Sequence, residues 1–206
     1  MAKIYKNYFD VVILSPREVR DYTIGVSKRF KKYGTKWDIG KTSYLPHLSL
    51  YHIAVKPKDF NKFITTLKKV IKSKDLGSLK LTKIKMASML LLMTDKPDWL
   101  KKLQSRVLKD CLKYYDWDYS TDKIWNIDQF PKPMRERGRA YIKKYGTPLV
   151  GKNFNPHFTL TKFLNKPLNF SKAELRVQKL KFEPGGVFVC ELGESHTCQR
   201  IVSRII

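Results

Sequence analysis

The sequence predicts an α+β fold with two similar halves, and three observations support this prediction. Apolar, β-prone runs alternate with segments in which apolar residues recur at helical spacing. The chain has 206 residues, 42% of them hydrophobic, so it can bury a sizeable core as one large domain or as two small lobes. A frame of Pro, His, an apolar residue, a hydroxyl residue and Leu occurs at 46–50 and again at 156–160.

The first half of the chain is expected to begin with a strand and a helix. Residues 8–14 form an apolar run that predicts a buried strand. Ser15 and Glu18 fit a capping box and Pro16 fits the first helical position, so a helix should begin here. Apolar residues at helical spacing continue this helix toward Gly34, where it should stop.

The same periodicities predict the later elements. The first frame runs into a β-prone stretch that ends near Val55. Apolar residues at helical spacing predict a second helix after Pro57 and a third that opens at Pro97. The further strands are expected within 79–93, which reads as two, near 157, at 187–192 and at 200–206.

Residues 116–152 differ from the rest because they are polar and rich in aromatic and basic residues. The helix expected at 134–145 carries Arg135, Arg137, Arg139, Lys143 and Lys144 together with Tyr141 and Tyr145. We interpret the segment as an insertion over the site or beside it. The helix face is either simply solvated or a surface for single-stranded nucleic acid, in which case Arg135, Arg139 and Tyr141 contact the substrate.

The charge balance indicates a polyanionic partner. The chain has 42 basic and 18 acidic residues, which gives a net charge of +24. RNA or a nucleotide is the expected partner, although a Lys-rich composition without functional meaning would give the same number. No apolar stretch approaches the ~20 residues that span a bilayer, so a soluble protein without a membrane partner is expected. We also expect it to be cytoplasmic and monomeric.

The three cysteines, Cys111, Cys190 and Cys198, have no tight ligand spacing. Reduced and mostly buried thiols are therefore expected, as in an intracellular protein. His196 and Cys198 lie close together in the sequence, but two ligands do not make a zinc site. We expect no metal and no cofactor.

The repeated frame places two kinds of polar group on one face of a strand. Residues i and i+2 of a strand point the same way, so His47 shares a face with Ser49, and His157 with Thr159. Two imidazoles on opposite sides of a phosphorus can supply the base and the acid for in-line displacement near neutral pH. The two hydroxyls can donate hydrogen bonds to the non-bridging phosphate oxygens. A single frame would more often hold a structural histidine, but chance repetition of the whole frame is rare.

These motifs, His47-Leu-Ser49-Leu and His157-Phe-Thr159-Leu, resemble the 2H phosphoesterase superfamily, which includes 2′,5′ RNA ligase-like (LigT-like) proteins and cyclic phosphodiesterases. The resemblance covers most of the chain except the insertion, and Ser49 stands where Thr is commoner. It implies two lobes of mostly antiparallel sheet with helices outside and a pseudo-two-fold central cleft. It also implies a metal-independent phosphodiesterase acting on 2′,3′-cyclic phosphates or 2′–5′ linkages.

The residues that flank the motifs carry weaker predictions. Strand parity places Tyr51 and Thr161 on the cleft face, where they either contact substrate or pack at the rim. Lys162 can contact phosphate only if a bulge reverses its parity. His52 should point away from the cleft and be structural, and His196 receives no role.

Two other functions remain open at this stage. The charge and the basic–aromatic insertion also fit an RNA-binding protein with an unused cleft. The same cleft chemistry run in reverse would join RNA ends through a 2′–5′ bond, and the sequence does not separate this ligation from hydrolysis.

Overall fold

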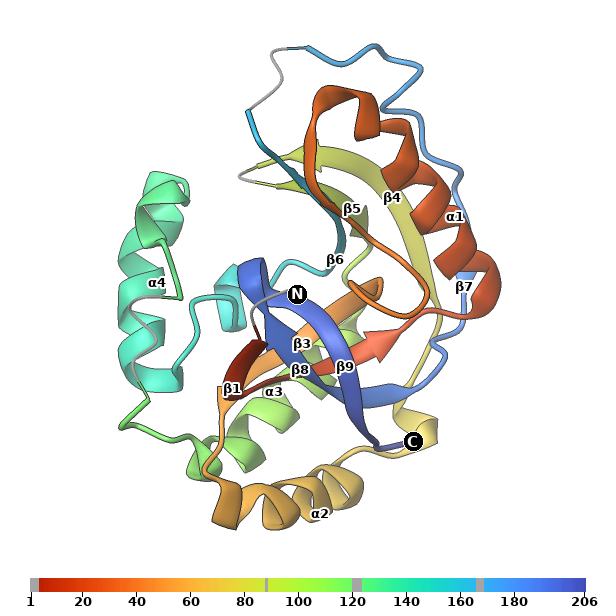
Figure 1. Cartoon of the computed structure of the whole chain (residues 1–206). Helices are drawn as coiled ribbons and strands as arrows, with labels where there is room; N and C mark the ends of the chain where they lie inside the picture. Colours follow the sequence, from red (N-terminus) through yellow and green to blue (C-terminus); the bar gives the residue numbers. More distant parts are fainter. Residues whose placement is uncertain (1–3, 88, 120–123, 166–168) are drawn as a thin grey trace.

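The computed structural model describes residues 4–87, 89–119, 124–165 and 169–206 and contains two antiparallel sheets (Figure 1). The first sheet has the strand order β3-β1-β8-β9 and the second has the order β2-β6-β5-β4-β7. The strands are β1 (Ile4–Leu14), β2 (Thr35–Asp38), β3 (His47–Ala54), β4 (Leu79–Met86), β5 (Leu90–Thr94), β6 (His157–Phe163), β7 (Lys181–Phe182), β8 (Val187–Gly193) and β9 (Thr197–Arg204).

The strand orders of the two sheets correspond to each other. The motif strand β3 pairs with β1, which is followed by β8 and β9. The motif strand β6 pairs in the same way with β5, which is followed by β4 and β7, while β2 is added at the far side of β6. Each sheet thus carries one histidine frame at the equivalent place, as expected for two related halves. The C-terminal strands β8 and β9 complete the sheet of the first half, so the two halves are interlocked.

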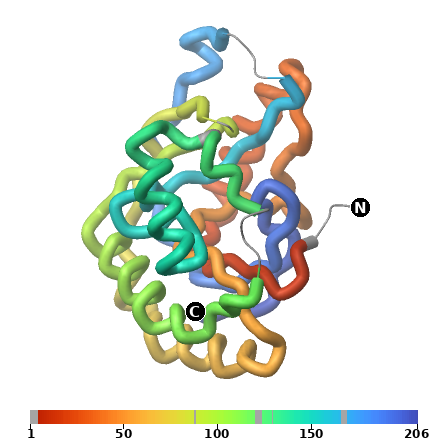
Figure 2. The backbone as a smooth tube through the Cα atoms, turned by 90° about the vertical axis from the view of Figure 1, so that its left-hand side faces the viewer, coloured from red at the N-terminus to blue at the C-terminus, as the bar shows by residue number. Residues whose placement is uncertain are grey.

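Four α-helices pack around the sheets in the described part of the chain: α1 (Arg17–Arg29), α2 (Phe60–Val70), α3 (Asp98–Cys111) and α4 (Lys132–Tyr145). Helix α1 contacts β6 of the second sheet, whereas α3 contacts α2 and β3 of the first. Helix α4 belongs to the insertion and lies on the outside of the molecule, on the side that faces the viewer in Figure 2. The helices of the two halves therefore support different sheets.

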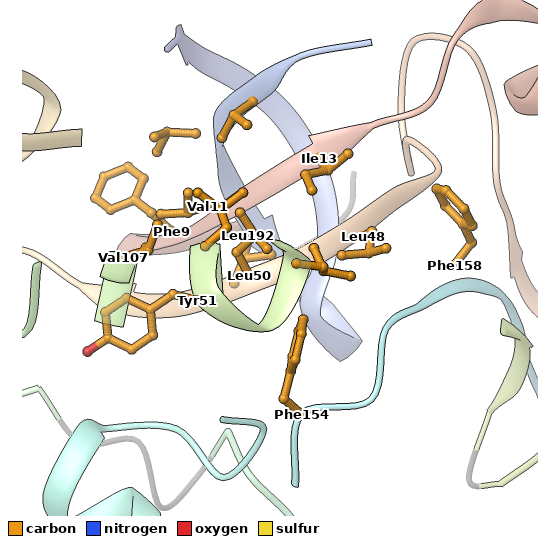
Figure 3. Close-up of a cluster of buried hydrophobic side chains, with 14 of the residues drawn as sticks. Phe9, Val11, Ile13, Leu48, Leu50, Tyr51, Val107, Phe154, Phe158 and Leu192 are labelled. Carbon is orange, nitrogen blue, oxygen red and sulfur yellow. The ribbon is translucent and has the colours of Figure 1, made fainter. Parts of the chain in front are cut away.

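One hydrophobic core runs through both sheets. Figure 3 shows Val11 of β1, Leu50 of β3 and Val107 of α3 gathered on the helix-covered face of the first sheet. Leu48 and Phe158, which follow the two motif histidines, are fully buried in the same core. The apolar position of each frame therefore anchors its strand, and the histidine beside it is fixed by that anchor.

Most predicted elements are present, and the differences have local causes. The capping box is absent because Pro16 itself is the N-cap of α1, and the Ser15 hydroxyl has no hydrogen-bond partner among the described residues. Strand β2 was not expected, and it is held by pairing to β6 rather than by its own short sequence. Strand β9 begins at Thr197, before the expected Arg200, because its first residues pair with the end of β8.

The expectation of three reduced cysteines is wrong. Cys190 and Cys198 form a disulfide between β8 and β9, with their Cα atoms 5.7 Å apart. Cys111 is a free, buried thiol whose pKa is raised to about 12 by burial. An intracellular location therefore no longer follows from the cysteines. Within the described ranges, we find no helix with the length and apolar character needed to cross a membrane.

Replacing Phe158 with alanine should lower the free energy of unfolding by about 3–5 kcal/mol, because the ring fills a fully buried site beside His157. Urea denaturation measures this change. The control is Leu164→Ala, whose side chain is 67% exposed and should matter by less than about 0.5 kcal/mol. Equal effects of the two substitutions would contradict the anchoring of β6 by Phe158.

Candidate active site

The two motif histidines are held in the same way. His47 and His157 are the first residues of β3 and β6. Nδ1 of His47 lies 2.7 Å from the carbonyl oxygen of Leu45, and Nδ1 of His157 lies 2.6 Å from that of Asn155. A carbonyl oxygen can only accept a hydrogen bond, so Nδ1 of each ring donates and carries the proton. Nε2 of each neutral ring is consequently the free, basic nitrogen.

The proline of each frame accounts for this arrangement. Pro46 and Pro156 stand between the histidine and the residue whose carbonyl it binds. A residue before proline is restricted to extended backbone, and proline itself has a fixed φ and no N–H to pair in a sheet. The turn into each motif strand is therefore stiff, and it brings the carbonyl two residues back within reach of the ring.

The two motifs meet at one narrow pocket. His47 of the first motif and Thr159 of the second both line it, together with Trp37, Ile39, Tyr44, Leu45, Ser195, His196, Thr197 and Cys198. His47 and His157 are close enough for a charge on one to lower the pKa of the other. The structure thus brings both frames to a single cleft between the sheets.

Burial keeps both catalytic candidates neutral. The pKa of His47 is lowered to about 4, mainly by burial, and the hydrogen bond to Leu45 only partly opposes this effect. Burial also lowers the pKa of His157, whose side chain remains partly exposed. Both rings are therefore unprotonated at neutral pH in the free protein, and a bound anion would be needed to stabilise a proton on either.

The hydroxyls of the motifs occupy the cleft face as predicted from strand parity. Ser49 and Thr159 are each partly exposed between two buried neighbours. Their surroundings differ, because the Ser49 Oγ lies 2.5 Å from Oδ2 of Asp10 on β1. Thr159 instead lines the pocket.

Each motif strand contains an irregularity at the same place. In the first sheet, Val12 pairs with Ser49 but Val11 pairs with Tyr51, so Leu50 is an extra residue. In the second sheet, Leu91 pairs with Thr159 but Leu90 pairs with Thr161, so Leu160 is an extra residue. Both shifts have the form of a β-bulge, which reverses the alternation of side chains beyond it. The final Leu of each frame is the bulged residue.

The bulges correct the placement of Tyr51 and Thr161, which were expected on the cleft face. Tyr51 is buried in the core, and its hydroxyl donates to the carbonyl of Tyr145 at 3.0 Å (Figure 3). Thr161 is fully buried, and its hydroxyl donates to the carbonyl of Trp37 at 2.6 Å. Strand parity failed for both residues because it assumes an unbroken strand.

The same bulges turn His52 and Lys162 toward the cleft. His52 was expected to point away, but it pairs with Asp10, and its Nε2 lies 3.3 Å from Oδ2 of that residue. Lys162 pairs with Trp37, which lines the pocket, and its charge contributes to the lowered pKa of His196. From the sequence, Lys162 was expected to contact phosphate only if a bulge preceded it, and this bulge is present.

Asp10 is the central residue of a buried polar group that was not predicted. Its side chain is fully buried, and its Oδ2 lies 3.8 Å from Nε2 of His47 in addition to its contacts with Ser49 and His52. Burial raises the pKa of Asp10 to about 8, although hydrogen bonds from Ser49 and the Tyr51 backbone oppose the shift. The sequence feature that could have predicted this polar group is the single acidic residue inside the apolar run 8–14.

His196 joins this group from the opposite side. Its ring stacks on that of Trp125, with the centroids 3.8 Å apart, and lies 5.3 Å from the ring of His52. Ser195 and His196 both have φ near +60°, a conformation uncommon for residues with side chains. Trp125 belongs to the insertion, so this segment covers one side of the polar group. All four histidines of the chain therefore gather around one cleft.

Helix α4 of the insertion makes mainly structural contacts. Arg135 donates to the carbonyl of Phe130 at 2.6 Å, and Arg139 pairs with Asp128 at 3.0 Å. Tyr141 lines a separate cavity of about 430 Å³ between α3 and α4. The structure does not bring these three residues into the pocket of the histidines, and contact between them and substrate stays a prediction.

No group of three or more His, Cys, Asp or Glu side chains within the described ranges is arranged to hold a metal ion. The side chains described above are bases, acids and hydrogen-bond donors.

Comparison with known proteins identifies the fold. No protein-family model and no curated protein matches the sequence. Solved structures do match, including the following three. TT0787 of Thermus thermophilus has TM-score 0.64 and 11% identity over 96% of both chains. E. coli LigT complexed with NADP+ has TM-score 0.56 and 11% identity over 98% of this chain and 95% of LigT. A phosphoesterase has TM-score 0.53 and 13% identity over 96% of both chains.

The chain therefore has the α+β fold of LigT and the phosphoesterase over nearly its whole length, and the predicted LigT-like α+β fold is confirmed. At these identities the likeness establishes the fold. The reaction has to be derived from the residues of the cleft.

NMR spectra that correlate the ring nitrogens with their protons should show His47 and His157 as neutral Nδ1–H tautomers at pH 7. His47 should remain neutral down to about pH 5, because its pKa is about 4. This folded-state pKa lies below the unfolded value of 6.5, so the stability that neutral His47 contributes is present above pH 6.5 and is lost as the pH falls toward 4. The variants His47→Gln and His157→Gln assign the signals. Nε2–H tautomers at both positions would contradict the proposed ring orientation.

Proposed function

We propose that this protein is a metal-independent phosphodiesterase that acts on 2′,3′-cyclic phosphates or 2′–5′ linkages of RNA or nucleotides. The observation that carries the proposal is the pair of neighbouring imidazoles, each with Nδ1 engaged and Nε2 free, beside a pocket that His47 of one motif and Thr159 of the other both line. This set supplies base, acid and phosphate ligands together. The LigT and phosphoesterase names of the structural neighbours support the same class of reaction.

The environments of the two histidines suggest their roles in hydrolysis. His47 keeps an unprotonated Nε2 throughout neutral pH, so it is suited to take the proton of the attacking water. His157 is more exposed, and the phosphate anion between the rings raises its pKa, so it is suited to protonate the leaving oxygen. The phosphorus–oxygen bond to the leaving group breaks as the bond to water forms. In ligation the two roles would be exchanged.

Ser49, Thr159 and Lys162 are the proposed phosphate ligands. The two hydroxyls donate to non-bridging oxygens, whose charge grows in the transition state. The bulge at Leu160 and the pairing of Lys162 with Trp37 support a phosphate contact by Lys162, which would add a positive charge. Trp37 and Tyr44 stack on each other at the wall of the pocket, with their centroids 5.7 Å apart, and offer an aromatic surface to a nucleobase.

An activity panel in EDTA tests this proposal. The substrates are a 2′,3′-cyclic mononucleotide, an RNA oligomer ending in a 2′,3′-cyclic phosphate, a 2′–5′ oligoadenylate and a 3′–5′ cyclic dinucleotide. His47→Ala and His157→Ala should each lower kcat by about 10²–10⁴-fold on the active substrate. Tyr51→Phe should retain activity, since Tyr51 lies in the core.

The profile of kcat/KM against pH should be bell-shaped, with its optimum below pH 6.5, because burial lowers the pKa of both histidines. Absence of hydrolysis of all four substrates, or an absolute requirement for a divalent metal, would overturn the proposed mechanism.

RNA binding independent of the cleft is the second candidate function, and the net charge of +24 favours it. Replacing the exposed Arg139, Lys143 and Lys144 of α4 with glutamine should weaken binding of single-stranded RNA and reduce the salt slope, by ~0.7 per lost phosphate contact. The matched control replaces the exposed Lys62, Lys68 and Lys69 of α2, which removes the same charge elsewhere.

Equal effects of the two triple variants on the salt slope would show that α4 is only a solvated face. Unchanged RNA affinity in His47→Ala, combined with absence of turnover in the wild type, would favour the binding function over the enzyme.

A further inference from the structure

Asp10 stands out because a fully buried carboxyl group contacts one of the proposed phosphate ligands. Its Oδ2 lies 2.5 Å from the Ser49 Oγ, which is a short hydrogen-bond distance between two oxygens. Its Oδ1 is buried without a hydrogen-bond partner among the described residues. An ionised carboxylate with one oxygen unsatisfied is costly in such a site, whereas a carboxylic acid is tolerated more easily.

The described groups around Asp10 offer no fixed positive charge to stabilise its ionised form. Tyr8 lies on the same strand, and His47 and His52 face it from β3. Cys190, its partner on β8, is in the disulfide and does not titrate. His196 and His157 lie near enough to His52 to lower its pKa. All four histidines have lowered pKa values, so they are neutral above pH 7.

The proton on Asp10 decides what the Ser49 hydroxyl can do. A carboxylate can only accept, so Ser49 must then direct its hydrogen toward Asp10 and away from the cleft. A carboxylic acid can donate its own hydrogen to the Ser49 Oγ. The hydrogen of Ser49 is then free to be donated to a phosphate oxygen.

We propose that Asp10 is a positioning residue that acts as a neutral acid, donating to Ser49 so that the Ser49 hydroxyl donates to the phosphate of the substrate. This inference rests on the proposed function, because it assumes a phosphate at the motif hydroxyls. Phosphate binding is consequently expected to weaken when Asp10 ionises, and this should occur near pH 8 because the pKa of Asp10 is about 8.

The second half of the molecule has a different residue at the equivalent place. Asp10 lies two residues before Val12, the partner of Ser49, and the equivalent position before Leu91, the partner of Thr159, is Met89. Thr159 is therefore not linked to an ionisable group in this way. The proposed effect is specific to the first motif.

The test measures the affinity of adenosine 2′- and 3′-monophosphate by calorimetry between pH 7 and 9.5. In this range the phosphate is already a dianion, because its second pKa is about 6, and the histidines of the free protein are neutral. Proton uptake by His157 on phosphate binding is common to the wild type and the variants, so the difference between them reports on Asp10. Wild-type affinity should fall roughly tenfold or more as the pH rises through 8, because the phosphate then loses one hydrogen bond, from the Ser49 hydroxyl. Ser49→Ala should bind more weakly at pH 7 and lose this pH-dependent step.

Asp10→Asn should remove the step while keeping the affinity found at pH 7, because its amide donates to Ser49 at every pH. A step of equal size in Ser49→Ala would overturn the proposal, since Asp10 would then act on phosphate directly. A flat wild-type profile with measurable binding would also overturn it, and would leave the proposed phosphodiesterase intact.

Failure of the activity panel, with the Ser49-dependent step still present in binding, would refute the phosphodiesterase and not the role of Asp10. Ser49→Ala is a small change at a partly exposed site, so the comparison with wild type remains available if Asp10→Asn does not fold.

Discussion

The hydrogen bond from Nδ1 of each motif histidine to the carbonyl two residues earlier is the constraint on which the candidate site depends. It fixes the ring plane, the tautomer and the direction of the free Nε2 at once. The bond can form because a proline holds the intervening turn and a buried apolar residue holds the strand that follows. Three of the five positions in the frame are thereby explained: proline, histidine and the apolar residue.

The fifth position is the bulged leucine, and it decides which of the later residues reach the cleft. Leu50 and Leu160 are buried where a regular strand would point them into the core, but the next residue is buried as well. Alternation therefore restarts one residue late, and His52 and Lys162 replace Tyr51 and Thr161 on the cleft side. Bulges are common beside active sites because they redirect single side chains without breaking a sheet.

The sequence was sufficient for whatever depends on local pattern. Periodicity located the helices and most strands, and parity placed the two histidines and hydroxyls, since these lie within three residues of a strand start. Local sequence pattern did not predict β2, because this strand forms through its pairing with β6. It did not predict the disulfide either, because the disulfide depends on the pairing of β8 with β9. The contact between Asp10 and His52 was not predicted for the same reason. Their meeting requires the register between β1 and β3, which is a non-local property.

The two halves share a backbone plan but differ in the charges that surround their histidines. Beyond the bulge, the first half presents His52 beside a buried carboxyl group, and the second presents Lys162 without one. A displacement at phosphorus needs opposite proton transfers on its two sides, so a cleft with identical halves would have to break its symmetry on the substrate alone. Here the protein itself breaks this symmetry, with the Asp10 carboxyl group next to the Ser49 hydroxyl in one half and Lys162 paired with Trp37 of the pocket wall in the other. In the proposed reaction, the repeated frame would supply the common chemistry, and the unlike residues beyond each bulge would give each side a separate task.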